Sequence, residues 1–157
     1  MKQQKTNGNQ TPLPSGGAGG GFRLSPNFTL AEMVATSHRK LQDTPTLDVI
    51  QNLQKLCVLV LQPLRDTVGA PVYINSGYRS KRLNAKVGGV PNSRHLLGKA
   101  ADIHCDNLAY AKVIFDILKQ NPNVGKVLIE AKGRSVWVHV QTKKPHSDSP
   151  QRGREGR

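Results

Sequence analysis

Hydrophobic residues recur at helical spacing in two segments of this chain. In residues 47–68 they return every three or four positions, at Leu47, Ile50, Leu53, Leu56, Cys57, Val60 and Leu64. A second stripe, in residues 109–119, consists of Ala111, Ile114, Phe115 and Leu118. This spacing places apolar side chains on one face of a helix. We therefore predict two amphipathic helices. The first should kink or break at Pro63, which lacks a backbone donor, and end at Gly69.

Shorter helices are predicted from their capping residues. Thr29 followed by Glu32 has the spacing of a capping box, which favours a helix start there. Thr46 is a suitable N-cap for the helix over residues 47–68. Residues 81–86 are expected to form a brief helix that stops at Gly88-Gly89, and residues 91–98 are interpreted as a loop.

Short runs of β-branched and apolar residues predict four strands. Residues 72–74 and 100–104 form the first two, and residues 127–130 and 136–140 are expected to form a hairpin around Lys132-Gly133. In the last of these strands Trp137, His139 and Gln141 share one face, and valines occupy the other. The order of elements indicates an α+β fold, with helices packed on a small, largely antiparallel sheet.

Composition indicates one domain with two polar ends. The chain has 157 residues, of which 36% are hydrophobic and 4% aromatic, so the core should be modest and aliphatic. Residues 1–21, rich in Gly, Gln and Asn, are expected to form a flexible arm, and residues 143–157 a disordered basic tail. The folded unit is then residues 22–142. Cys57 and Cys105 are expected to be buried free thiols.

The net charge of +13 favours an anionic partner. The two ends carry +3 each, which leaves +7 for the middle. Anionic cell-wall polymer and nucleic acid both fit this charge, but the scarcity of aromatic residues argues against nucleic acid. No apolar run approaches the roughly 20 residues that span a bilayer, so no membrane insertion is expected. No secretory signal is visible at the N-terminus. We expect a monomer.

Three side chains have the chemistry of a catalytic metal site. His95 and Asp102 stand seven residues apart with Gly98 between them, and His139 lies on the last predicted strand. Two neutral nitrogens and one carboxylate are a donor set that suits catalytic zinc, which keeps one position open. Taken singly, each residue could instead be a hydrogen-bonded or ion-paired core residue. The combination favours the metal site.

Three sequence blocks resemble one family. The first, with Ser93 ahead of it, is His95-x-x-Gly98-x-Ala100-x-Asp102, and the others are Trp137-Val138-His139 and Ser76-Gly77-Tyr78-Arg79-Ser80. They resemble the signatures of the zinc D-Ala-D-Ala peptidase superfamily and occur along the chain in the family's order. This superfamily includes D-Ala-D-Ala carboxypeptidases, dipeptidases and phage endolysins. The resemblance covers residues 26–141 and is closest to the carboxypeptidase branch. It implies a hedgehog/DD-peptidase-like fold.

The resemblance also implies roles for individual residues. His95, Asp102 and His139 would hold Zn²⁺, and Arg79 would stabilise the developing oxyanion. Ser93 would bind substrate or cap the metal loop, and Trp137 would contact substrate. The implied activity is that of a zinc metallopeptidase, which hydrolyses peptide bonds in peptidoglycan stem peptides at a D-amino acid.

The general base is the weak point of this interpretation. Several enzymes of the superfamily carry an acid three residues before the last histidine, where this chain has Val136. Glu130 is our candidate, although a four-residue hairpin pairing Glu130 with Ser135 would put it about 13 Å along the strand from His139. His104, on the Asp102 face, is the second choice. The missing acid leaves an alternative open: a zinc-containing cell-wall binding module with weak or no catalysis.

Overall fold

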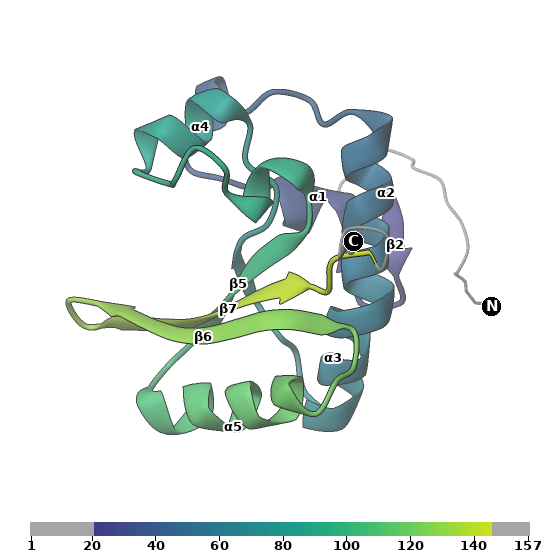
Figure 1. Ribbon diagram of the computed structural model, residues 1–157, viewed down its shortest axis with the longest axis vertical. Coiled ribbons are helices and arrows are strands. Elements are labelled where there is room, and N and C mark those ends of the chain that lie inside the picture. Colours follow the sequence, from purple (N-terminus) through teal and green to yellow (C-terminus); the bar gives the residue numbers. More distant parts are fainter. Residues whose placement is uncertain (1–20, 146–157) are drawn as a thin grey trace, which may run out of the picture.

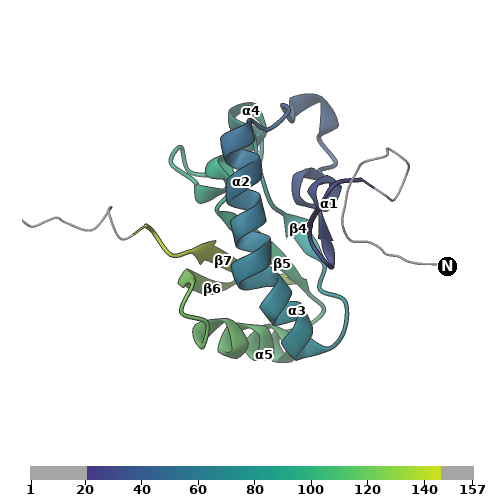
Figure 2. The same ribbon diagram turned by 90° about the vertical axis from the view of Figure 1, so that its right-hand side faces the viewer.

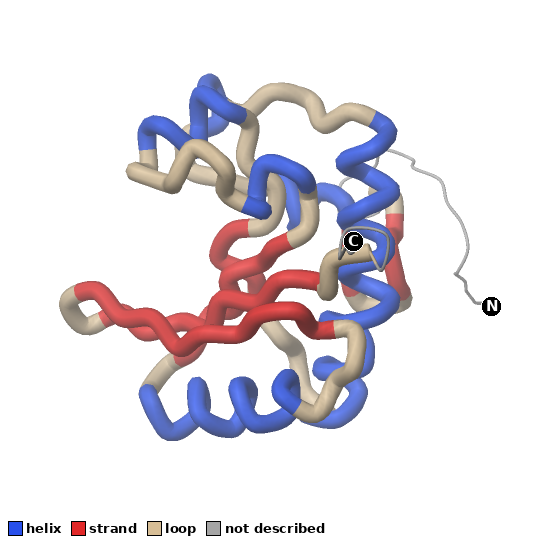
Figure 3. Tube along the Cα trace, viewed as in Figure 1, coloured by secondary structure: helices blue, strands red, loops and turns tan. Residues whose placement is uncertain are grey.

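Four antiparallel strands form the sheet that carries the site. The structure is a computed structural model that describes residues 21–145. The strand order is β4-β5-β7-β6, with bounds β4 Ile74–Ser76, β5 Ala100–Cys105, β6 Val124–Lys132 and β7 Ser135–Thr142. Helix α5 (Leu108–Lys119) lies along one side of this layer and the short helices lie on the other (Figures 1 and 3). The α+β prediction is confirmed.

The predicted first helix runs through Pro63 without a break. It consists of α2 (Leu47–Leu56), a π-helical turn η2 (Cys57–Leu61) and α3 (Gln62–Val68), and forms one continuous rod in Figure 2. Pro63 has no N–H for the carbonyl of Leu59, four residues earlier, and the side-chain amide of Asn121 donates to that carbonyl instead, at 2.8 Å. Gly69, with a φ of 72°, ends the rod as expected.

The capping predictions are confirmed. Helix α1 (Leu30–Val34) begins with a complete capping box between Thr29 and Glu32. The Thr46 side chain accepts from the backbone N–H of Val49 at the start of α2. Helix α4 (Lys81–Lys86) has Ser80 as its N-cap.

Several local predictions need correction. Strand β4 begins two residues later than expected, at Ile74, and the expected loop over residues 91–98 contains a 3₁₀ helix, η3 (Arg94–Leu97). The sequence pattern did not predict the small ribbon of β2 (Arg23–Ser25) and β3 (Phe28–Thr29), or the 3₁₀ turn η1 (Arg39–Leu41). These segments are too short to show a period.

The β6–β7 hairpin is tighter than predicted. Lys132 pairs with Ser135 across a two-residue loop, so Glu130 pairs with Trp137 and not with Ser135. Gly133 has a φ of 61°, a left-handed conformation that tight hairpin loops require. The four-residue hairpin was therefore wrong, and the register of β6 shifts by two residues relative to β7.

The two faces of the sheet have different roles. One face contributes Ala101, Ile103, Val138 and Val140, all fully buried, to a core shared with α2, η2, α3 and α5. Alternation turns Asp102 and His139 to the other face, away from α5. Both cysteines of the described chain are buried and free, as predicted. Within residues 21–145, no helix has the length and hydropathy to cross a membrane.

The predicted end segments fall mostly outside the described residues. The arm over residues 1–21 and the tail over residues 143–157 overlap residues 21–145 only at their inner edges. The division of the chain into arm, domain and tail therefore stays a prediction.

Candidate metal centre

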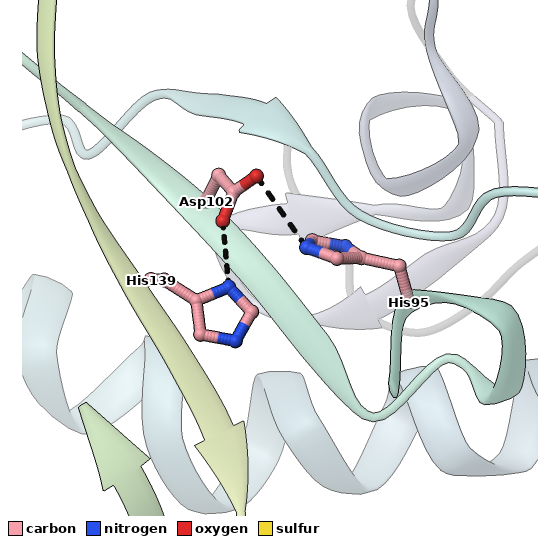
Figure 4. Close-up of side chains that lie close together, drawn as sticks. All are labelled: His95, Asp102 and His139. Carbon is pink, nitrogen blue, oxygen red and sulfur yellow. Dashed lines mark hydrogen bonds and ion pairs between the residues drawn. The ribbon is translucent and has the colours of Figure 1, made fainter. Parts of the chain in front are cut away.

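His95, Asp102 and His139 converge into one cluster. Their ligand atoms all lie within 4.8 Å of one another (Figure 4). Asp102 and His139 face each other as paired residues of β5 and β7, and His139 Nδ1 is 2.8 Å from Asp102 Oδ1. His95 reaches the same carboxylate from η3, with its Nε2 3.4 Å from Asp102 Oδ2.

Local capping shapes the turn that carries His95. Ser93 is the N-cap of η3, and its hydroxyl accepts from the backbone N–H of His95 at 3.2 Å. Gly98 ends the turn with a φ of 74°, and an added Cβ there would lie 2.8 Å from the carbonyl oxygen of Val49. Only glycine fits that conformation and that contact. Of the two roles expected for Ser93, the structure displays the capping one.

One nitrogen of His95 is left without a hydrogen bond. Nδ1 lies 2.7 Å from the backbone carbonyl of Gly77 and donates to it. This bond fixes the tautomer and leaves a lone pair on Nε2. Nε2 is buried and has no hydrogen-bond partner in the described chain, and His95 as a whole is only 2% exposed. A buried acceptor without a donor is costly, and a metal ion in the cluster would satisfy it.

His139 is held on both sides. Its Nδ1 faces Asp102, and its Nε2 lies 2.9 Å from the side-chain amide nitrogen of Gln141. With the proton on Nδ1, Nε2 accepts from this amide. Gln141 therefore restrains the ring in the plane that points Nδ1 at the cluster.

Asp102 stays anionic in this setting. Burial alone would raise its pKa, but the hydrogen bond from His139 holds the pKa well below its usual range. The cluster thus offers two imidazoles and one ionised carboxylate, which is the donor set of a three-ligand catalytic zinc site. The residues present fit Zn²⁺.

Arg79 points into the site and is not a surface turn residue. Its side chain is 15% exposed and its Nη2 is 3.3 Å from Asp102 Oδ2. Nε donates to Ser76 Oγ at 3.1 Å, and Nη1 to Asn84 Oδ1 at 3.0 Å. Burial lowers the pKa of Arg79, whereas the charge and hydrogen bond of Asp102 and the charge of Glu130 raise it. The guanidinium is a fixed cation beside the cluster.

The half-buried side-chain amide of Gln42 holds the segment around Arg79. The Nε2 of Gln42 donates to the carbonyls of Val34 and Tyr78, both at 2.9 Å, and its Oε1 accepts from the N–H of Ser80 at 2.8 Å. Gln42 therefore bonds to the residues on both sides of Arg79. Sequence reasoning missed Gln42, because nothing in its neighbourhood marks it as different from an exposed loop residue.

Glu130 and Trp137 form a pair next to His139. They are opposite each other across β6 and β7, and Trp137 Nε1 donates to Glu130 Oε1 at 2.8 Å. His139 is opposite Leu128, so Glu130 is its diagonal neighbour on the same face, about 7–8 Å between Cα atoms. The register thus brings Glu130 closer to the cluster than the sequence interpretation allowed.

The other histidines do not join the cluster. His104 shares the face of Asp102 but is exposed, and its Nε2 bonds to Asp106 Oδ1 at 2.9 Å. His38 is exposed and precedes η1. His146 lies outside the described residues. Val136 packs against the core, so its position faces away from the cluster.

Comparison with known proteins identifies the family. The Peptidase M15 family profile matches residues 26–141, about three-quarters of the chain. The chain belongs to the Peptidase M15 family. A zinc D-Ala-D-Ala carboxypeptidase of Streptomyces albus G is 48% identical to it over 44 residues, which make up 27% of this M15 chain and 17% of the relative. The chain therefore matches only a small part of the relative's length.

These findings confirm the resemblance to the zinc D-Ala-D-Ala peptidase superfamily. The M15 match covers the three blocks on which the resemblance was based. The donor set, the family and the zinc carboxypeptidase relative together support Zn²⁺ as the cofactor of this M15 peptidase.

Proposed function

We propose that this M15 chain is a zinc metallopeptidase that hydrolyses peptide bonds of peptidoglycan stem peptides at a D-amino acid. The observation that carries the proposal is the buried Nε2 of His95, which has no hydrogen-bond partner within residues 21–145 and lies beside Asp102 and His139. The family match and the name of the relative support the substrate class.

His95, Asp102 and His139 are the proposed zinc ligands. Bound zinc would polarise a peptide carbonyl and lower the pKa of water. His95 is held by the Gly77 carbonyl, and Asp102 by its pairing with His139 in the strand ladder. Ligands held in this way need little reorganisation to bind the ion. To bind the ion through Nδ1, His139 would move its proton to Nε2, and the Gln141 side chain would turn so that its amide oxygen accepts from Nε2.

Arg79 is the proposed oxyanion-stabilising residue. Three of its five N–H groups bond to Ser76, Asn84 and Asp102, which leaves two for a substrate carbonyl oxygen. Arg79 also lines a hollow of ≈ 290 Å³ with residues such as Thr36 and Asn75.

Glu130 is the proposed general base, and Trp137 a proposed substrate contact. The Glu130 carboxylate lies on the face of His139, and its hydrogen bond from Trp137 fixes its direction. We propose that it accepts the proton of the attacking water. His104 is less suitable, since it is exposed and bonded to Asp106. Ser93 keeps its hydroxyl proton while it caps η3, so it can also donate to substrate.

The direct test is to measure metal content and hydrolysis together. Zinc-loaded protein is incubated with purified peptidoglycan and with a synthetic stem peptide ending in D-Ala-D-Ala, and the products are analysed by mass spectrometry. Release of D-Ala indicates a carboxypeptidase, and an internal cut indicates an endopeptidase. We expect one zinc per chain, with both zinc and hydrolysis lost in His95→Ala and retained in the control His104→Ala. Hydrolysis that survives in a metal-free His95→Ala protein would refute the proposal.

A second candidate is a zinc-containing cell-wall binding module without turnover. It is favoured by one observation: Val136 occupies the position of the family's acid and faces the core. In that case the protein sediments with insoluble peptidoglycan and no new termini appear. The appearance of new termini separates the two candidates, and Glu130→Gln then tests the base, because it lowers kcat only if Glu130 is the base.

A further inference from the structure

A buried asparagine lies behind Arg79. Helix α4 is short, and its lysine and arginine side chains are exposed, yet Asn84 in the same helix is only 3% exposed. Its Oδ1 accepts from Arg79 Nη1 at 3.0 Å, and its Nδ2 donates to the carbonyl of Val90 at 2.8 Å. Asn84 thus joins the guanidinium to the loop that follows α4.

The chemistry of the two partners determines the orientation of the Asn84 amide. A guanidinium can only donate, and a backbone carbonyl can only accept. The oxygen must therefore face Arg79 and the nitrogen must face Val90. The alternative orientation would leave both bonds unmade in a buried place.

Gly89 packs directly against the hydrogen bond between Arg79 and Asn84. A Cβ at Gly89 would lie 2.0 Å from Asn84 Oδ1 and 2.9 Å from Arg79 Nη1. The Gly89 N–H also donates to the backbone carbonyl of Asn84, at 2.8 Å. A residue larger than glycine would have to displace the amide or the guanidinium.

The network sets how Arg79 meets Asp102. Nε donates to Ser76 and Nη1 to Asn84, and these two bonds fix the guanidinium so that Nη2 alone reaches the carboxylate, through one bond of 3.3 Å. Without Asn84, Nη1 would be free, and arginine prefers a bidentate grip on a carboxylate. That grip would occupy the oxygens that Asp102 needs for the metal.

We propose that Asn84 is a positioning residue: it turns Arg79 so that the guanidinium faces the substrate side and leaves Asp102 to the metal. The inference rests on the proposed roles of Arg79 and Asp102. It predicts that Asn84 acts on both zinc affinity and turnover, and that it acts only through Arg79.

The test is a double-mutant cycle with Asn84→Ala and Arg79→Ala, in full-length protein. Zinc affinity is measured by competition with a chromophoric chelator, kcat and KM with the stem peptide, and folding by thermal unfolding. We expect Asn84→Ala to weaken zinc binding about tenfold and to lower kcat about tenfold, with a smaller rise in KM, which is typical of residues that orient a metal ligand. In the Arg79→Ala background, Asn84→Ala should have no further effect on either quantity.

A purely structural role for Asn84 would change zinc affinity equally in both backgrounds, and that result would overturn the inference. The zinc cycle decides the inference even if the wild-type protein cleaves nothing. In that event the proposed function fails by itself.

Gly89→Ala provides a second route that leaves Asn84 in place. It should weaken zinc binding as Asn84→Ala does. The matched control is Gly88→Ala, which is strained by a φ of 78° but has no atom of the described chain within 4 Å of its new Cβ. Gly88→Ala should lower stability and leave zinc affinity unchanged. Equal zinc affinities in the two glycine variants would contradict the inference.

Discussion

Gly77→Ala is expected to weaken the metal site by adding one methyl group to the residue whose backbone carbonyl accepts from His95 Nδ1. The new Cβ would lie 2.3 Å from the carbonyl oxygen of Met33, and 3.1 Å from both its carbonyl carbon and its Cα. All three are backbone atoms, so no side-chain rotation can relieve the overlap. Non-bonded heavy atoms prefer about 3.5 Å, so the segment must retreat from α1 by about 1 Å.

Two short hydrogen bonds depend on the present position of Gly77. The N–H of Tyr78 donates to the Met33 carbonyl at 2.7 Å, and His95 Nδ1 donates to the Gly77 carbonyl at 2.7 Å. Each contributes about 1 kcal/mol, and about 1–3 kcal/mol is lost where a buried group is left unpaired. We therefore expect the free energy of unfolding to fall by about 2–4 kcal/mol. Zinc affinity should fall by about 10- to 100-fold, as when a bond that orients a ligand is removed, or about 1.4–2.7 kcal/mol.

Urea unfolding of the metal-free protein and a chelator competition titration measure the two effects separately. Gly69→Ala is the control: its φ of 72° strains an alanine, but an added Cβ meets no described atom within 4 Å. It should cost about 1 kcal/mol of stability and leave zinc binding unchanged. If Gly77→Ala binds zinc as tightly as the wild type, the Gly77 carbonyl does not orient His95 and the reasoning is refuted.

Three further predictions follow from single contacts. Thr46→Ala removes the cap of α2 and should lower the free energy of unfolding by about 1 kcal/mol in urea titrations. The folded-state pKa of Asp102 lies below its unfolded value of about 3.9. Ionised Asp102 therefore stabilises the metal-free protein fully above about pH 3.9, and this stabilisation declines as the pH falls further. The free energy of unfolding should fall less steeply with decreasing pH in Asp102→Asn than in the wild type, and an unchanged pH dependence would contradict this. Burial raises the pKa of the Cys57 and Cys105 thiols. Both should therefore react with a maleimide reagent far more slowly in the native protein than in the urea-unfolded protein. Rapid labelling of the native protein would show instead that the thiols are accessible.

Most of the helices and the three candidate metal-binding residues could be identified from the sequence because their signals are local. The Thr29–Glu32 capping box and the apolar stripe over residues 47–68 involve residues at most four positions apart. The candidate ligand set, which remains a proposal, followed from residue chemistry and from the resemblance of three short blocks. The error in pairing Glu130 arose because the hairpin register depends on the length of one turn, which the hydrophobic alternation alone does not determine.

The sequence by itself determined the longer helices and strands, the α+β class and a set of residues with the chemistry to bind a divalent metal. Only the tertiary structure decided which groups orient them: the Gly77 carbonyl behind His95, Asn84 behind Arg79, and Gln42 around the Arg79 segment. The physical reason is that helix propensity and capping act between near neighbours in the chain. These supporting bonds join segments up to 38 residues apart, and they form only after the sheet and helices have brought those segments together.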